Sequence, residues 1–207
     1  YGHDFYAPQS FLTPDGRRIV IGWLDMWESP QPEQEDGWAG MLSLPRELTL
    51  SADNHLQMQP AREVESLRGA WFPWPISTLN NQQMTLVEHC DAMEVILQWD
   101  CANSSAEQYG IRLGDGLRLY VDAQMQRLVL ERYYPQYGLC GTRSVALNLN
   151  DTLSLRLFVD SSSVEVFVNE GEACLSSRIY PADCRELALF AWTGSASLIA
   201  GGAWQLE

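Results

Sequence analysis

The clearest pattern in the second half of the chain is an alternation of apolar and polar residues with a period of two. In residues 94–99, Val95, Leu97 and Trp99 fall on one side, and residues 153–160 repeat the pattern. Such segments form strands with a core face and an outer face. Short strands at regular spacing, without helices between them, predict an antiparallel β-sandwich. Further strand-like runs occupy residues 108–113, 116–122, 127–134, 142–148, 164–169, 173–180, 186–192 and 197–201.

The first sixty residues predict a smaller set of antiparallel strands. Residues 10–14 and 17–27 are strand-like on either side of Asp15 and Gly16, a dipeptide suited to a tight hairpin turn. A polar, acidic loop with two prolines and a second hairpin ending at Pro60 complete the set.

A change of pattern separates these two regions. Residues 61–69 are the one helix-like stretch, with Val64 and Leu67 three positions apart and Gly69 as a stop signal. Two prolines in residues 71–77 exclude a helix and predict an extended crossing segment. The chain therefore divides into residues 1–58, a linker at 59–75, and residues 76–207.

Composition narrows the class of protein. Hydrophobic residues make up 46% of the 207 residues, which is typical of a globular protein. The 13 basic and 27 acidic side chains give a formal charge of −14, which repels nucleic-acid phosphates and anionic lipid headgroups. No apolar run approaches the roughly 18 residues that cross a bilayer. We therefore expect neither a nucleic-acid partner nor a membrane partner.

The cysteines and histidines are scattered. The five cysteines form no C-x-x-C pair, and His3, His55 and His89 lie far apart in the sequence. This spacing disfavours a disulfide framework and a metal site, and it fits a reducing compartment. We expect a cytoplasmic protein without a metal site. No glycine-rich phosphate cradle is present either, so we expect no organic cofactor.

Aromatic and acidic side chains gather near the N-terminus. They suit a carbohydrate, because aromatic faces pack on the C–H faces of a sugar and carboxylates accept its hydroxyl hydrogen bonds. They equally suit a core or subunit interface with a solvated acidic rim, which composition alone favours. Asp25 and Glu28 border a polar loop, and we expect both at the surface rather than as a catalytic pair. The set comprises Asp4, Phe5, Tyr6, Trp23, Asp25, Trp27, Glu28 and Trp38.

Four blocks of sequence resemble the bacterial sucrose-6-phosphate hydrolases, or invertases, of glycoside hydrolase family 32. They are HDFYAPQSF at residues 3–11, GRRIVIGWLDMW at 16–27, GWAGMLSLPRELTL at 37–50 and FVDSSSVEVFVNEGE at 158–172, in the family order. The resemblance implies an all-β fold. Residues 1–58 would then be the end of a five-bladed β-propeller, followed by the linker at 59–75 and by an antiparallel β-sandwich at 76–207.

The resemblance also implies a reaction. Family members cleave the β-fructofuranosidic bond of sucrose or sucrose 6-phosphate by a retaining mechanism with two carboxylates. The family motifs N-D-P, R-D-P and E-C are absent from these 207 residues. We expect no catalytic residue in this chain, the catalytic carboxylates upstream of Tyr1, and no activity from the chain alone. The alternatives are a non-catalytic carbohydrate-binding module and a structural β-sandwich module.

What the resemblance carries over is the rim of the sugar pocket. Asp4, Tyr6 and Gln9 match the family's D-F-Y-A-x-Q stretch, and Trp23 matches the Trp of its I-G-W motif. These four are the expected substrate-binding residues. Glu165 in the last block is expected to belong to a fold signature, on the face of its strand that points away from the sandwich core.

Two further expectations concern partners. A 6-phosphate requires basic donors, and the only basic residues among the first 45 are Arg17 and Arg18, in a hairpin expected to point into solvent. This favours unphosphorylated sucrose. Residues 1–58 amount to about one propeller blade, whose apolar strands lack neighbouring blades. We therefore expect that the isolated chain self-associates through this N-terminal piece, or else that this piece is more weakly protected than residues 76–207.

Overall fold

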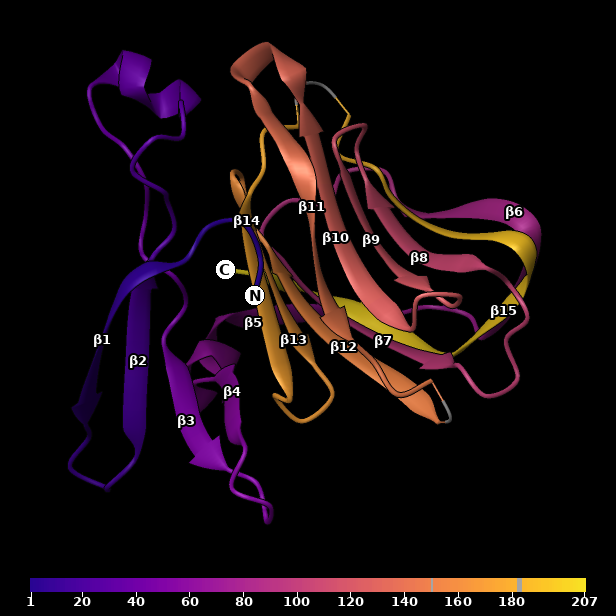
Figure 1. The fold of residues 1–207 in the computed structure, drawn as a ribbon, viewed down its shortest axis with the longest axis horizontal. Coiled ribbons are helices and arrows are strands. Elements are labelled where there is room, and N and C mark those ends of the chain that lie inside the picture. Colours follow the sequence, from indigo (N-terminus) through magenta and orange to yellow (C-terminus); the bar gives the residue numbers. More distant parts are fainter. Residues whose placement is uncertain (150, 182–183) are drawn as a thin grey trace.

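The structure, a computed structural model, describes residues 1–149, 151–181 and 184–207. Its N-terminal part is a four-stranded antiparallel sheet in the order β1-β2-β3-β4, which lies beside a larger β-structure (Figure 1). The hairpin at Asp15 and Gly16 is confirmed, and Gly16 has a φ of 84°, which glycine adopts without strain. The four strands are β1 (Tyr6–Leu12), β2 (Arg18–Trp23), β3 (Arg46–Leu50) and β4 (Leu56–Pro60).

The larger part consists of two packed layers, as predicted. One has the order β11-β10-β9-β8-β15 and the other β15-β7-β12-β13-β14. Their strands are β7 (Met93–Asp100), β8 (Gln108–Leu113), β9 (Leu117–Asp122), β10 (Arg127–Tyr134), β11 (Leu139–Ala146), β12 (Thr152–Val159), β13 (Ser163–Val168), β14 (Ala173–Arg178) and β15 (Leu187–Leu206).

Helical structure in the described residues is limited to short 3-10 turns, which confirms the all-β prediction. They are η1 (Pro32–Asp36), η2 (Arg62–Leu67) and η3 (Pro135–Tyr137). The turn η1 lies in the segment expected to be a loop. Across the described ranges, no helix has the length and apolar character needed to cross a bilayer.

One long strand, β15, runs through both layers. The sequence predicts separate strands at 186–192 and 197–201, and this is wrong, because β15 runs without a break for 20 residues. Its first half pairs with β8 and its second half with β7. Between the halves, Thr193 and Gly194 have positive φ angles of 55° and 131°. The strand therefore bends in the interval between the two predicted strands, and passes from one layer into the other.

Residues 61–77 also differ from the prediction. The expected helix is the shorter 3-10 turn η2, and the expected crossing segment begins as a paired strand, β5 (Arg68–Pro73), hydrogen-bonded to β15. The next strand, β6 (Ser77–Val87), follows β15 past both of its halves. Packing explains the pairing of β5: the Trp71 ring occupies the space where a side chain at Gly202 would otherwise lie.

The predicted alternation places the sandwich core correctly. Val95, Leu97 and Trp99 are fully buried between the layers, and Leu155 and Leu157 on the adjacent strand β12 lie beside Leu97 and Val95 in the same layer. Each strand of the sandwich thus contributes one apolar face to a common core, whose stabilisation comes mainly from removing these side chains from water.

The N-terminal sheet docks on β13 and β14 through a buried ion pair. Arg46 Nη2 lies 2.5 Å from Glu165 Oε2, and the Leu44 backbone N–H donates to Glu165 Oε1 at 2.6 Å. Arg46 also donates to Ser176 Oγ at 2.6 Å. Glu165 faces away from the sandwich core, as predicted, but the N-terminal sheet covers it, so it is buried rather than solvated.

We predict that Glu165→Ala destabilises the chain by roughly 3–5 kcal/mol, because the substitution leaves the Arg46 charge buried without its partner. The measurement is urea-induced unfolding of the 207-residue chain. The matched control is Glu63→Ala, which removes an ion pair to Arg17 from a carboxylate whose side chain is 60% exposed and should cost less than about 1 kcal/mol. Equal losses for the two variants would contradict the assignment of Glu165 as the anchor of the interface.

Candidate functional site

Three aromatic side chains meet at one end of the four-stranded sheet. Tyr6 on β1 pairs with Trp23 on β2 in the strand register. The ring of Trp27 meets both edge-on, with centroids 5.6 Å from Trp23 and 6.1 Å from Tyr6. Trp27 is 75% exposed and Tyr6 41%. The three residues, called the aromatic face below, offer apolar ring surface of the kind that packs against a sugar.

A bulge in β1 brings Gln9 to the same side of the sheet. The register shifts between Tyr6 and Gln9, where Ala7 has a φ of 44°. Gln9 then pairs with Ile21, which lies two residues before Trp23 on the same side of β2. Three of the four predicted substrate-binding residues therefore share one side, and Gln9 adds an amide that can donate and accept hydrogen bonds.

Asp4, the fourth predicted residue, lies in the segment before β1, where its side chain points into the sandwich. It is fully buried, and its Oδ2 accepts hydrogen bonds from Arg132 Nη1 at 2.5 Å and from the Arg178 backbone N–H at 2.7 Å. Burial raises the pKa of Asp4, while the charge of Arg132 acts in the opposite direction. In this position the carboxylate joins the two parts of the chain.

The neighbouring His3 is also buried. Its Nε2 lies 3.2 Å from the carbonyl oxygen of Gly141 on β11, to which the ring donates if that nitrogen carries the proton. Burial, together with the charges of Arg132 and Arg143, lowers the pKa of His3 to about 3. The ring is therefore neutral in the folded chain at ordinary pH.

Asp25 is not at the surface, contrary to the prediction. It is buried, and its Oδ1 accepts hydrogen bonds from the Met26 backbone N–H at 2.6 Å and from Gln31 Nε2 at 2.7 Å. Glu28 is exposed, as expected. The prediction for Asp25 failed because a polar segment can fold back and satisfy its own carboxylate, which composition does not show. Asp25 therefore stabilises the loop rather than acting as one half of a carboxylate pair.

Sequence reasoning missed several residues near the aromatic face. Trp27 belonged to the aromatic cluster noted in the sequence, yet no motif selected it. Arg178, the last residue of β14, and Tyr180, two residues beyond it, contact the loop behind the face, and no local pattern links them to it. Only the tertiary fold brings them together.

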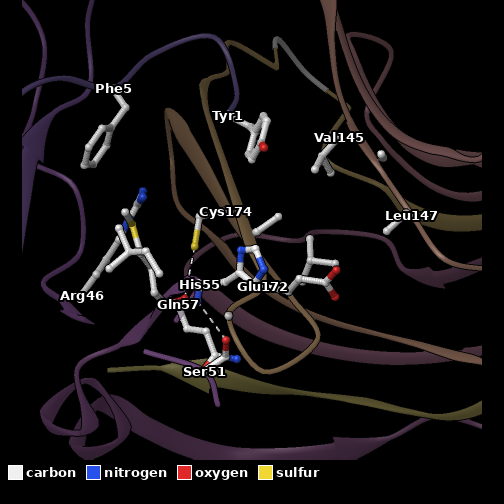
Figure 2. A pocket seen from close by; sticks show the side chains of 16 residues that line it. Tyr1, Phe5, Arg46, Ser51, His55, Gln57, Val145, Leu147, Glu172 and Cys174 are labelled. Carbon is white, nitrogen blue, oxygen red and sulfur yellow. Dashed lines mark hydrogen bonds between the residues drawn. The ribbon is translucent and has the colours of Figure 1, made fainter. Parts of the chain in front are cut away.

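A cavity of about 700 Å³ lies between the N-terminal sheet and the sandwich (Figure 2). Phe5, Arg46, His55 and Cys174 are among its walls, and none of the four predicted substrate-binding residues lines it. The Cys174 thiol donates to the carbonyl oxygen of Met58 at 3.2 Å, and burial raises the pKa of this thiol to about 11. A thiol in this state is not a nucleophile at neutral pH.

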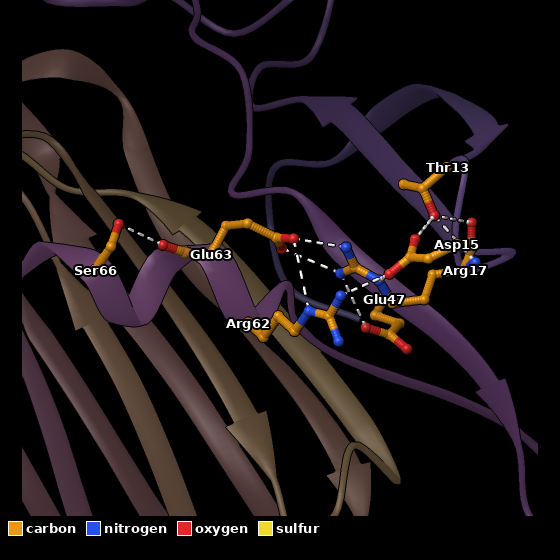
Figure 3. A network of polar contacts seen from close by, with 7 residues as sticks. All are labelled: Thr13, Asp15, Arg17, Glu47, Arg62, Glu63 and Ser66. Atoms are coloured by element: carbon orange, nitrogen blue, oxygen red, sulfur yellow. Dashed lines mark hydrogen bonds and ion pairs between the residues drawn. The ribbon is translucent and has the colours of Figure 1, made fainter.

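The first hairpin does not leave Arg17 free in solvent, contrary to the prediction (Figure 3). Its guanidinium contacts Asp15 at 2.9 Å, Glu63 at 2.5 Å and Glu47 at 3.4 Å. Hydrogen bonding to Arg17 lowers the pKa of Glu63 to about 2. Arg17 thus contacts three carboxylates, two of which, Asp15 and Glu63, also pair with Arg62, while Arg18 donates to a serine hydroxyl on β1.

Two models of one enzyme family match the chain. Residues 1–60 match the model described as the N-terminal domain of glycosyl hydrolases family 32, and residues 63–205 match the C-terminal model of the same family. Together they span both the four-stranded sheet and the sandwich.

Relatives and a solved structure agree with these matches. A sucrose-6-phosphate hydrolase and a raffinose invertase, both from Escherichia coli, are each 55% identical over 99% and 100% of this chain. The chain spans 43% of the length of each of these curated relatives. The structure of a sucrose-6-phosphate hydrolase from Lactobacillus gasseri superposes with a TM-score of 0.76 at 25% identity, covering 100% of this chain and 42% of that one.

We predict that His3→Gln reduces the loss of stability on acidification. Since the folded-state pKa of His3 is about 3 and the unfolded value about 6.5, the unfolded chain takes up a proton below pH 6.5 that the folded chain does not. Stability is lost as the pH falls from 6.5 towards 3. Between pH 7 and pH 5 the variant should lose less free energy of unfolding than the wild type, by on the order of 2 kcal/mol.

Urea titrations at the two pH values measure this difference. His55→Gln, the same substitution at an exposed histidine in the loop between β3 and β4, serves as the control. If His3→Gln and the wild type lose the same free energy between pH 7 and pH 5, His3 does not contribute to the acid sensitivity.

Proposed function

The chain belongs to glycosyl hydrolase family 32, and from this we propose that the protein containing it hydrolyses the β-fructofuranosidic bond of sucrose or sucrose 6-phosphate. The two Escherichia coli relatives, named as a sucrose-6-phosphate hydrolase and a raffinose invertase, support this substrate class. The structural observation that carries the proposal is the aromatic face, in which Tyr6, Trp23 and Trp27 meet beside Gln9 on one side of the sheet.

In this proposal the chain supplies part of the sugar-binding rim. Tyr6 and Trp23 contact the sugar ring through their aromatic surfaces, and Gln9 hydrogen-bonds to its hydroxyl groups. Asp4, which is fully buried, takes a supporting part by tying the rim to Arg132 and to β14.

The chemical step needs groups that this chain does not supply. The retaining mechanism uses two carboxyl groups about 5 to 5.5 Å apart, one as nucleophile and one as acid and base. Asp25 is engaged within its own loop, and Glu28 is exposed to solvent. The nucleophile and the acid/base therefore come from another part of the protein, and the chain by itself is inactive.

The position of the basic residues favours unphosphorylated sucrose. Arg18 and Trp23 stand five residues apart on β2, roughly 16 Å at the rise of a strand. Arg17 contacts three carboxylates at that far end of the sheet. Neither arginine is placed to hold a phosphate group on a sugar that contacts Trp23.

The state of the cysteines fits a cytoplasmic location for the protein. All five lie in the described part of the chain, and all five are free thiols. Free thiols persist in reducing compartments, whereas oxidising ones favour disulfides.

The test of this function compares three proteins with sucrose as substrate, by the rate of glucose release. The full-length enzyme should cleave sucrose, and the isolated 207-residue chain should not. Trp23→Ala in the full-length enzyme should lower kcat/KM by an amount equivalent to about 1 to 3 kcal/mol, because one wall of the sugar site is lost.

Trp192→Ala is the matched control, since Trp192 lies on β15 in the sandwich and is 37% exposed. It should leave kcat/KM unchanged. Turnover by the isolated chain at an enzyme-like rate would contradict the absence of catalytic groups. Full activity of Trp23→Ala would show that Trp23 is not part of the sugar site.

Self-association is the second property proposed for the isolated chain. Strand β1 is the edge of its sheet and is exposed along its whole length, with Phe11 53% and Leu12 60% exposed. An open edge with apolar side chains pairs readily with another chain. Light scattering should show concentration-dependent association that Leu12→Lys weakens. A strictly monomeric wild-type chain at the same concentrations would contradict this.

A further inference from the structure

Two residues of the sandwich contact the loop that carries Trp27 of the aromatic face. We infer that Tyr180 and Arg178, both in the sandwich, are positioning residues for sugar binding, which act through Gln31 and Glu33 to hold the turn that carries Trp27. This inference rests on the function proposed above, and it assigns the sandwich a part in substrate recognition.

The turn that carries Trp27 is closed by hydrogen bonds within its own loop. The Ser29 backbone N–H donates to the Met26 carbonyl oxygen at 2.9 Å. Asp25, just before the turn, accepts a hydrogen bond from Gln31, just after it, at 2.7 Å. Asp25 and Gln31 are both buried, whereas the Trp27 side chain between them is 75% exposed. The position of Trp27 therefore depends on two buried residues at the base of the turn.

Residues of the sandwich hold that base. The Tyr180 hydroxyl lies within hydrogen-bond distance of Gln31 Oε1 and, at 2.9 Å, of Glu33 Oε2. Arg178 Nη1 lies 2.6 Å from Glu33 Oε1 and 3.4 Å from the carbonyl oxygen of Leu24. Both ends of the segment 24–33 are thus tied to one short stretch of the sandwich.

Arg178 is itself fixed in place. It is fully buried, and its Nε and Nη2 donate to the carbonyl oxygen and the hydroxyl of Ser162 at 2.9 and 3.0 Å. Its backbone N–H donates to Asp4 at 2.7 Å. A guanidinium held at this many points presents a fixed donor to the loop.

Gln31 transmits the constraint because its amide works in both directions. Its nitrogen donates to Asp25, and its oxygen lies within hydrogen-bond distance of the Tyr180 hydroxyl, whose single proton it shares with Glu33 Oε2. Without the tyrosine hydroxyl, these two buried acceptors lose that donor, and the amide is free to turn away from Asp25. Trp27 would then sample more orientations relative to Trp23 and Tyr6, so the sugar would bind to a less ordered surface.

The experiment uses the full-length enzyme with the variant Tyr180→Phe, which removes only the hydroxyl. Since the aromatic face contacts the sugar before and during the reaction alike, KM for sucrose should rise about threefold to tenfold while kcat stays within about twofold. The melting temperature, measured alongside, separates a positioning effect from a loss of folded enzyme.

Tyr120→Phe is the matched control. Tyr120 lies on β9 in the sandwich, is buried, and packs its ring against that of Phe190 at 6.3 Å, away from the loop that carries Trp27. The same substitution there should leave KM unchanged. A second test combines Tyr180→Phe with Trp27→Ala: if Tyr180 acts through Trp27, its removal should add nothing once the indole is gone.

An unchanged KM in Tyr180→Phe overturns the inference, and so does an effect of equal size in the Trp27→Ala background. A fall in kcat alone, in proportion to the loss of folded enzyme, also overturns it. Failure of the wild-type enzyme to cleave sucrose would instead refute the proposed function, so the two failures are distinguishable.

Discussion

Burying the Glu165 carboxylate between the N-terminal sheet and the sandwich carries a desolvation cost that its partners must offset. They come from one stretch of chain, in which Arg46 supplies two guanidinium nitrogens and Leu44 a backbone N–H, so that both carboxylate oxygens accept hydrogen bonds. Such an arrangement tolerates little displacement, because a shift of either surface would leave a charge unpaired away from water. The pair therefore fixes β3 against β13, and through β3 it fixes the neighbouring β2 and β1.

A second group of buried charges, around Arg178, extends this docking towards the aromatic face. Arg178 forms an ion pair with Glu33 in the loop before β3, and its backbone N–H donates a hydrogen bond to Asp4 in the segment before β1. The aromatic face adjoins these segments, since Tyr6 begins β1, Trp23 ends β2 and Trp27 lies in the loop that also carries Glu33. The sandwich has its own apolar core and does not need the N-terminal sheet to bury it. The sheet, in contrast, depends on the sandwich for the partners of its buried charges.

This dependence explains which features the sequence predicts. The sandwich strands follow from a period of two, because each of them has its own core face. The same periodicity places Glu165 on the opposite face but cannot say what covers it, since Arg46 lies 119 residues earlier. It also fails at Thr193 and Gly194, where a bend inside β15 has the composition of a turn. For the aromatic face, motif resemblance selects Tyr6, Gln9 and Trp23, whereas the residues that support the face come from contacts distant in sequence.

The use of arginine rather than lysine at the interface follows from the number of hydrogen-bond acceptors that one side chain must reach. All 13 basic residues of the chain are arginine, and the buried ones show what that side chain offers. Arg178 reaches two oxygens of Ser162, the carbonyl oxygen of Leu24 and the carboxylate of Glu33, on two separate segments. A lysine has its three donors on a single nitrogen and cannot span such a set, whereas the planar guanidinium presents five donors in fixed directions. The interface also has an apolar part, in which Leu44 and Met58 pack against Phe158, Phe167 and Cys174. Its buried polar groups still need partners, because a buried acceptor left without a donor costs about 1–3 kcal/mol, and one guanidinium with donors in several directions satisfies acceptors on both sides at once.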